Sequence, residues 1–381
     1  YECVPMRFIK HVYRIHTYAQ DGRLFEGKTP VSAFLNSSYD GSFIAGLMEL
    51  RYIQSLPVER IINYFESHGF TLKKPTAHKL MEKASSLFEN LYKCIRQTAL
   101  SDPYKAADET YYKILVPEKN SKGKGVRKGY LWVVVGINTR MIYLLYDDGS
   151  RSEKVILNEL GGCKGIIQSD GYSPYRKLES DAYPHITRIP CLQHIKRKFI
   201  DCGEDEPDAK RIVELINTLY QNEHKHKIGV DGWTVEQNLV HRKKYAPDIL
   251  GEIKDVLDDI EERGDLLPKS ELKEAITYLR NEWNAVVDIF NYGDTYLDNN
   301  IVERMNRYIS LSRKNSLFFG SHKGAERGAI LYTIALTCRM NKVNLFEYLT
   351  DVINRTAEWQ PNTPLEKYRQ LLPDRWEKAN D

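Results

Sequence analysis

The sequence lacks three features that would each point to a particular class of protein. Its six cysteines are scattered and form no Cys-x-x-Cys pair, which argues against a disulfide framework and a four-cysteine zinc site. Its longest apolar runs, such as 131–137, are far shorter than the roughly 20 residues of a membrane-spanning helix. The opening residues carry no basic-then-apolar signal pattern. We therefore expect a cytoplasmic protein with no transmembrane segment.

The chain also lacks a net charge of either sign. Its 55 Lys and Arg residues nearly balance 52 Asp and Glu residues, which leaves a net charge of +3. A uniformly basic coat for nucleic acid is therefore excluded, but local patches are not, because near-cancelling totals can hide segregated charge. A hydrophobic fraction of 42% and a length of 381 residues predict a folded protein of two or three domains.

The first hundred residues predict an N-terminal helical domain, which we place at 1–100. Apolar residues recur at helical spacing in 43–55, in 58–69 and from Pro75 onward. The Gly-containing turn at 68–71 resembles that of a helix-turn-helix, whose second helix would present basic residues to DNA. An ordinary helical hairpin with a solvated basic face is an equally good interpretation.

From residue 108 the pattern changes from helices to strands. Three strands in meander order are followed by a helix, two further strands and a basic helix, which predicts a mixed α/β sheet. These segments are 110–116, 130–138, 141–146, 152–160, 165–169, 187–192 and 194–200. A charged, all-helical stretch at 203–290 then interrupts the core. We divide the remainder into a first part of the core at 101–202, this insertion, a second part at 291–356 and a C-terminal tail at 357–381.

Three acidic residues stand out by their positions. Asp108 lies at the start of the first predicted strand, Asp170 at the end of a later strand, and Glu303 on a helix. Such carboxylates can converge on one face of a sheet, where their oxygens suit Mg²⁺ or Mn²⁺. Two ions would activate a water or 3′-hydroxyl and stabilise the leaving oxygen of a phosphodiester displacement. Taken singly, each acid also has a structural explanation: a turn acid, a helix N-cap, and an i,i+4 partner of Arg307.

Basic residues gather beside these acids and predict contacts with DNA. Guanidinium and ammonium groups bind phosphates, and the alternatives are a solvated hairpin tip and a salt-bridged helix surface. The predicted DNA-binding residues are Lys122, Lys124, Arg127, Lys128, Arg197, Lys198, Arg304, Arg307, Arg313 and Lys314.

Cys191 and His194 have a spacing seen in zinc sites, but no second pair accompanies them. A zinc site is therefore the less favoured interpretation of this spacing. Trp233 and Trp283 lie in the helical insertion and are expected in its core, with stacking on a DNA base as the minor alternative.

Several strings resemble the transposases of the insertion sequence 66 family, and together they span nearly the whole chain. They are Asp108-Glu109-Thr110, Asp170-Gly171-Tyr172, Asp298-Asn299-Asn300 with Glu303-Arg304, the run 313–321, the run 329–332 and the run 371–376. The resemblance implies a DDE transposase with an RNase H-like catalytic core, in which 203–290 is an insertion. The catalytic and metal-binding triad would be Asp108, Asp170 and Glu303, and two Mg²⁺ or Mn²⁺ ions would be the cofactors. Because a Cys and a His recur before a basic helix in this family, the resemblance also implies that His194 borders the site or hydrogen-bonds in the core.

The same resemblance implies partners and a reaction. The protein would cut the ends of a mobile element and join the 3′ ends to target DNA, as a homodimer or larger assembly in the bacterial nucleoid. Two departures from the family pattern are visible: Cys3 has no nearby partner for a zinc module, and Thr110-Tyr111 stands where acid-Thr-Pro is usual. A non-catalytic DNA-binding regulator and a structure-specific, metal-dependent nuclease are the alternative functions.

Overall fold

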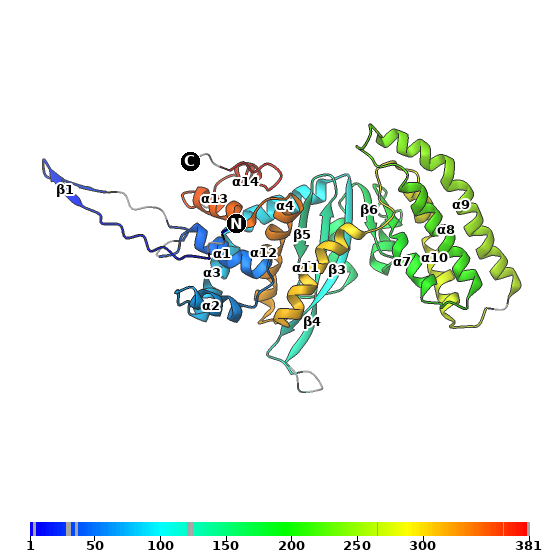
Figure 1. Ribbon diagram of the computed structural model, residues 1–381, viewed down its shortest axis with the longest axis horizontal. Helices are drawn as coiled ribbons and strands as arrows, with labels where there is room; N and C mark the ends of the chain where they lie inside the picture. Colours follow the sequence, from blue (N-terminus) through cyan, green and yellow to red (C-terminus); the bar gives the residue numbers. More distant parts are fainter. Residues whose placement is uncertain are drawn as a thin grey trace.

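A six-stranded mixed sheet forms the centre of the protein, with helices packed around it (Figure 1). The computed structural model describes residues 1–2, 5–27, 32–34, 37–119, 123, 125–264, 266–360 and 362–378. Across these ranges no helix is both long enough and apolar enough to cross a membrane. The predicted mixed α/β fold is confirmed.

The long strand β3 organises this sheet. The strand order is β5-β4-β3-β6-β7, and β8 pairs with the far end of β3. The predicted meander corresponds to β3, β4 and β5, which are antiparallel, whereas β6 and β7 run parallel to β3. The strands are β3 (Tyr104–Leu115), β4 (Val126–Gly136), β5 (Met141–Leu145), β6 (Gly165–Ser169), β7 (Ile186–Pro190) and β8 (Phe318–Phe319).

The predicted start of the first strand is wrong. β3 begins at Tyr104, so Asp108 lies inside the strand rather than at its start. The early residues Tyr104 and Lys105 pair with Ile166 and Ile167 of β6, about 60 residues later in the chain. Because this pairing is non-local, the local residue pattern around Tyr104 did not reveal it.

Helices from both ends of the chain pack together beside β4 and β5. They are α1 (Gly41–Tyr52), α2 (Val58–Ser67), α3 (Lys74–Leu87), α4 (Glu89–Ser101), α12 (His322–Met340) and α13 (Leu345–Thr356). In α12, Thr333 Oγ1 accepts a hydrogen bond from the Leu144 amide (2.9 Å), and Thr337 Oγ1 accepts one from the Ile142 amide (3.2 Å). These bonds satisfy the outer edge of β5, which would otherwise be open to strand pairing.

The N-terminal and C-terminal segments hold elements that the sequence pattern did not predict. An exposed hairpin of β1 (Thr17–Gln20) and β2 (Arg23–Glu26) projects from the body (Figure 1). The tail contains the short helix α14 (Leu365–Arg369) and, as expected, docks through buried Leu371 and Leu372. The basic residues Lys74, His78 and Lys79 of α3, and Lys73 directly before it, are exposed, as either interpretation of the helical hairpin requires.

The stretch after β7 is helical and has its own hydrophobic cluster. Its helices are α7 (Leu192–Ile200), α8 (Pro207–Glu223), α9 (Val235–Arg263) and α10 (Glu271–Ile289). Two short elements, α6 (Ser173–Arg176) and η1 (Lys177–Glu179), and helix α5 (Glu153–Leu160) precede it in the chain. The long helix α11 (Asn300–Ser316) follows it and packs against β3. Trp233 stacks on His226 at 3.8 Å between ring centroids, at the start of α9.

A buried arginine connects this helical stretch to the segment that leads into α11. Arg242 on α9 donates to Glu223 on α8 (Nε to Oε2, 3.0 Å) and to the Thr295 carbonyl (2.6 Å). Burial raises the pKa of Glu223, but the hydrogen bonds and charge of Arg242 outweigh burial and leave this pKa below its ordinary value. Arg242 therefore links the helices α8 and α9 to the segment around Thr295, which leads into α11.

We expect Arg242→Met to lower the free energy of unfolding by about 3–5 kcal/mol, because it leaves Glu223 and several backbone carbonyls without their buried donor. The matched control is Arg211→Met, since Arg211 pairs with Glu252 on the surface and such pairs contribute about 1 kcal/mol or less. Chemical denaturation of both variants measures the difference. Equal losses in the two variants would contradict this role of Arg242.

Candidate functional site

The register of β3 and β6 brings two of the predicted acids together. The last paired residues of these parallel strands are Ala106 and Gln168. Asp108 follows Ala106 by two residues, and Asp170 follows Gln168 by two residues. The two acids therefore lie at the same level along the strand direction, on neighbouring chain segments. Adjacent strands lie about 4.8 Å apart, which places the two carboxylates side by side.

Asp108 is held in an enclosed, negatively charged position. Its Oδ1 accepts a hydrogen bond from the Glu109 amide (2.8 Å), and its Oδ2 accepts one from Asn306 Nδ2 on α11 (2.6 Å). Burial, followed by the charges of Glu109 and Asp170, raises the pKa of Asp108 to about 8. Near neutral pH this carboxyl group therefore holds a proton unless a cation compensates its charge.

Glu109 is a third carboxylate at this place, which the sequence did not single out. It pairs with Arg151 (Nε to Oε1, 3.1 Å) and accepts a hydrogen bond from the Tyr175 hydroxyl (3.3 Å). Burial raises the pKa of Glu109, and Arg151 opposes this shift. The acidic group consequently contains more charge than the predicted triad alone.

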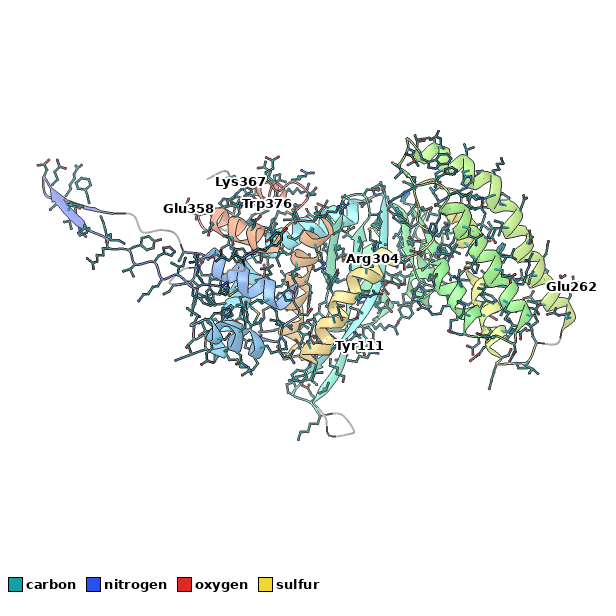
Figure 2. All side chains as sticks on the ribbon, in the orientation of Figure 1. Tyr111, Glu262, Arg304, Glu358, Lys367 and Trp376 are labelled. Atoms are coloured by element: carbon teal, nitrogen blue, oxygen red, sulfur yellow. The ribbon has the colours of Figure 1, made fainter. Side chains whose placement is uncertain are left out.

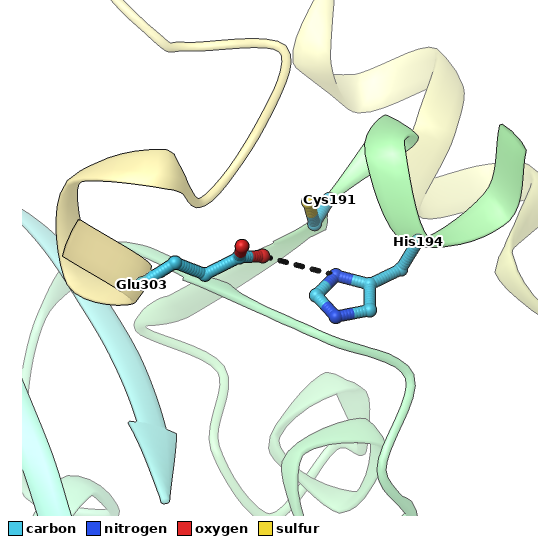
Figure 3. A group of neighbouring side chains, drawn as sticks. All are labelled: Cys191, His194 and Glu303. Atoms are coloured by element: carbon cyan, nitrogen blue, oxygen red, sulfur yellow. Dashed lines mark ion pairs between the residues drawn. The ribbon is translucent and has the colours of Figure 1, made fainter. Parts of the chain in front are cut away.

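Glu303 reaches the site from α11, one helical turn before Asn306. Figure 3 shows its carboxylate directed toward His194 of α7, with Oε1 and Nδ1 3.8 Å apart. The Sγ of Cys191 completes a group whose ligand atoms lie within 4.8 Å of one another. Cys191 itself accepts a hydrogen bond from the Asn299 amide (3.2 Å), and burial raises the pKa of its thiol to about 11.

Several polar atoms around the acids are buried but have no hydrogen-bond partner among the described residues. They are Glu303 Oε1, His194 Nδ1, Asn299 Oδ1 and Asn306 Oδ1. Buried polar atoms are normally paired, and a group of unpaired ones calls for an explanation such as a bound ion. Three of the four are oxygens, which are the ligands that Mg²⁺ and Mn²⁺ prefer.

The simple structural explanations for the three acids do not match these positions. Asp108 lies within a strand and is not a turn acid. Asp170 accepts a hydrogen bond from the Tyr172 amide (3.1 Å) but does not cap α6, whose N-cap is Tyr172. Among the described residues, Glu303 pairs with His194 and not with Arg307.

The predicted DNA-binding residues lie on three elements near the acids. Arg127 and Lys128 are exposed on β4, Arg197 and Lys198 on α7, and Arg304, Arg307 and Lys314 on α11. Figure 2 shows Arg304 on α11 and Tyr111 on the neighbouring strand β3. Arg313 is half-buried and donates to the Tyr111 carbonyl (2.5 Å). Lys122 and Lys124, like Cys3, lie outside the described residues.

Asn299 and Asn306 are site residues that the sequence analysis did not assign. They stand four residues before and three after Glu303, a spacing that puts all three on one face of a helix. Asn299 Nδ2 donates to the Ala107 carbonyl (3.0 Å) and Asn306 to Asp108, so both side chains attach the α11 region to β3. Their helical spacing around Glu303 was the feature of the sequence that could have identified them.

We expect Asp108→Asn to become increasingly stabilising, relative to the original chain in EDTA, as the pH rises from about 4 to 8. The folded state keeps a proton on Asp108 up to about pH 8, whereas an unfolded Asp releases it near 3.8, so rising pH favours unfolding of the original chain. Melting temperatures across this range measure the effect, with Asp181→Asn as a control at an exposed acid. A melting-temperature difference that stays constant with pH would contradict the raised pKa.

Comparison with known proteins assigns the family. The family model described as Transposase IS66 family matches residues 36–327. The uncharacterized protein y4jD of Sinorhizobium fredii is 26% identical over 87% of this chain and 65% of its own length. The uncharacterized proteins y4hP and y4qI of the same organism are 24% and 26% identical, over 70% and 69% of their lengths. This chain therefore spans about two thirds of the length of these relatives, and it belongs to the IS66 transposase family.

Proposed function

We propose that this protein is a DDE transposase that cuts DNA at the ends of its mobile element and joins the 3′-hydroxyl ends to target DNA. The observation that carries this proposal is the shared register of Asp108 and Asp170 on β3 and β6, with Glu303 on the helix packed against β3. Joining two ends at once would require a homodimer or larger assembly on DNA, associated with the bacterial nucleoid.

The sheet topology supports an RNase H-like catalytic core. Three antiparallel strands continue into two parallel strands on one side of β3, and the first two acids lie where the parallel pairing ends. The helices α8 to α10 stand between the second and third acids in the chain, as an insertion in such a core would.

The donor set fits a divalent metal. Asp108, Asp170 and Glu303 would hold Mg²⁺ or Mn²⁺, and we propose two ions. Without bound cations, the negative charges of three carboxylates would be poorly compensated. The unpaired Glu303 Oε1 and the raised pKa of Asp108 support this fit. When bound, such ions would activate the attacking oxygen and stabilise the leaving oxygen of the phosphodiester.

The chain's own residues position the reacting groups. Asn306 fixes one oxygen of Asp108, and the Tyr172 amide fixes one oxygen of Asp170. His194 lies beside Glu303 and limits the directions that this longer side chain can take. The exposed Arg304 and Arg307 on the same helix would bind the flanking phosphates.

The regulator and nuclease hypotheses differ from this proposal in what they require. A non-catalytic regulator descended from a transposase would be expected to lose an acid, but the sequence retains all three, on β3, directly after β6 and on α11. A structure-specific nuclease would use the same acids but release its products. Strand-transfer assays with a precleaved 3′-hydroxyl end distinguish joining from release.

We expect Asp170→Asn to abolish Mn²⁺-dependent cleavage of element-end DNA while DNA binding persists, because the change removes a negative ligand without altering the exposed basic residues. Asp181→Asn is the matched control at an exposed acid and should cleave normally. Gel assays of cleavage, with binding measured in parallel, give both quantities. Cleavage retained by purified D170N would refute the assignment of Asp170.

The group of Cys191, His194 and Glu303 also raises a question of metal identity, since zinc accepts sulfur and nitrogen ligands. We expect Cys191→Ser to leave Mn²⁺ binding unchanged, because its thiol is already engaged by the Asn299 amide, whereas Glu303→Gln should weaken this binding. Mn²⁺ titration by electron paramagnetic resonance measures the affinity, and elemental analysis measures zinc. Stoichiometric zinc that disappears in C191S would assign this group to zinc instead.

A further inference from the structure

Beyond the acids, three cations and three tyrosines alternate along one side of the sheet. The Arg313 guanidinium lies 3.9 Å from the ring centre of Tyr111, and the Lys128 ammonium lies 4.2 Å from the same ring. Lys128 is also 5.3 Å from the Tyr130 ring, and Arg151 is 5.1 Å from it. Arg151 finally lies 4.1 Å from the Tyr172 ring. We name the set Arg313, Tyr111, Lys128, Tyr130, Arg151 and Tyr172 the cation–tyrosine ladder.

The ladder follows from the pairing of β3 with β4. Tyr111 and Tyr130 are cross-strand partners, so their side chains stand on the same face of the sheet. Lys128 lies two residues before Tyr130 on that face. Arg313 comes from α11, Arg151 from the segment before α5, and Tyr172 from the segment after β6. Segments far apart in the chain thus form one continuous row.

Two cations of the ladder, Lys128 and Arg313, lie against aromatic rings and are not paired with acids in the described part of the chain, and Arg313 also donates a hydrogen bond to the Tyr111 carbonyl. No carboxylate pairs with Lys128 or Arg313 within the described ranges, whereas Arg151 pairs with Glu109. A ring fixes a cation in place without neutralising its charge. The row therefore keeps a positive potential in a defined position.

A pair of lysines on the same face also favours binding of an anion. Lys113 and Lys128 are direct cross-strand partners, and both are exposed. Like charges directly opposite each other destabilise a strand pair. An anionic ligand bound between the two lysines would remove this repulsion. Without such a ligand, the repulsion only weakens the pairing of the two strands.

The ladder ends at the acids. Arg151, its last cation, contacts Glu109, the neighbour of Asp108 in the chain. Tyr172, its last ring, is two residues from Asp170 and donates its amide to that carboxylate. The ladder therefore ends at Glu109 and beside Asp170, and a polyanion lying along it would reach this edge of the acid group.

We propose that the cation–tyrosine ladder is the track that holds the phosphate backbone of the DNA strand leading into the acids. This inference rests on the proposed function, because it takes the acid group as the place of cleavage. Lys128, with Lys113 opposite it, and Arg313 bind successive phosphates, and the tyrosine rings keep these cations in position. Contacts of this kind do not depend on base sequence.

The direct test compares Lys128→Gln with Lys254→Gln, an equal charge change at an exposed lysine on α9. Binding of a fluorescein-labelled 30-base-pair duplex of arbitrary sequence is followed by anisotropy over a range of salt concentrations. K128Q is expected to bind several-fold more weakly and to reduce the slope of log affinity against log salt by about 0.9, the value for one lost phosphate contact. K254Q is expected to match the original chain. Equal affinities and slopes in K128Q and K254Q would overturn the proposal.

A second comparison tests the rings without changing any charge. Tyr111→Leu removes the ring that contacts both Lys128 and Arg313, whereas Tyr111→Phe keeps it, and both variants keep the Tyr111 carbonyl that Arg313 binds. Y111L is expected to lose affinity several-fold and Y111F to retain it, with melting curves verifying that both are folded. Equal affinity of Y111L and the original chain would show that the rings do not position the cations and would overturn that part of the track.

These outcomes are separate from those of the acid variants. If D170N loses cleavage while K128Q binds DNA like K254Q, the ladder proposal is wrong and the proposed function stands. If D170N cleaves normally, the proposed function is wrong, whatever the ladder does.

Discussion

Two carboxylates at the same level of neighbouring parallel strands impose an electrostatic constraint on the whole site. Asp108 and Asp170 sit side by side because β3 and β6 pair up to Ala106 and Gln168. Glu109 adds a further acid to this enclosed place, and burial, followed by the charges of Glu109 and Asp170, raises the pKa of Asp108 to about 8. Such repulsion persists in a folded protein only where the surrounding structure holds the groups in position, as it often does at functional sites.

The surrounding elements provide that support by different means. The asparagines Asn299 and Asn306 attach the α11 region to β3, and α7 places His194 beside Glu303. Farther away, Arg242 on α9 binds both Glu223 on α8 and the segment that leads into α11. The helices α8 and α9 are thus connected to the segment that precedes Glu303. On the sheet face, cations held by tyrosines extend from the acids, so a chain of nearly zero net charge presents separated zones of opposite sign.

Much of this arrangement could be predicted from local residue patterns. Runs rich in valine and aromatic residues around a turn identified the strands β4 and β5, and helical spacing identified α1, α7 and the helices of 203–290. The strings around Asp108, Asp170 and Glu303 indicated the family. The start of β3 was missed because Tyr104 and Lys105 pair with a strand about 60 residues away. Trp233 and Trp283 were the aromatic residues weighed for base stacking, yet the rings beside the acids are tyrosines, whose partners come from separate segments.

The sequence by itself determined the family, the class of fold and which residues can carry charge or coordinate a metal, because these follow from residue type and short-range spacing. Only the tertiary structure decided that Asp108 and Asp170 share one level, that Glu303 faces His194, and that Arg313, Lys128 and Arg151 stand in one row with three tyrosines. The physical reason is that strand register and helix packing bring together residues up to about 200 positions apart, and no local pattern records those distances.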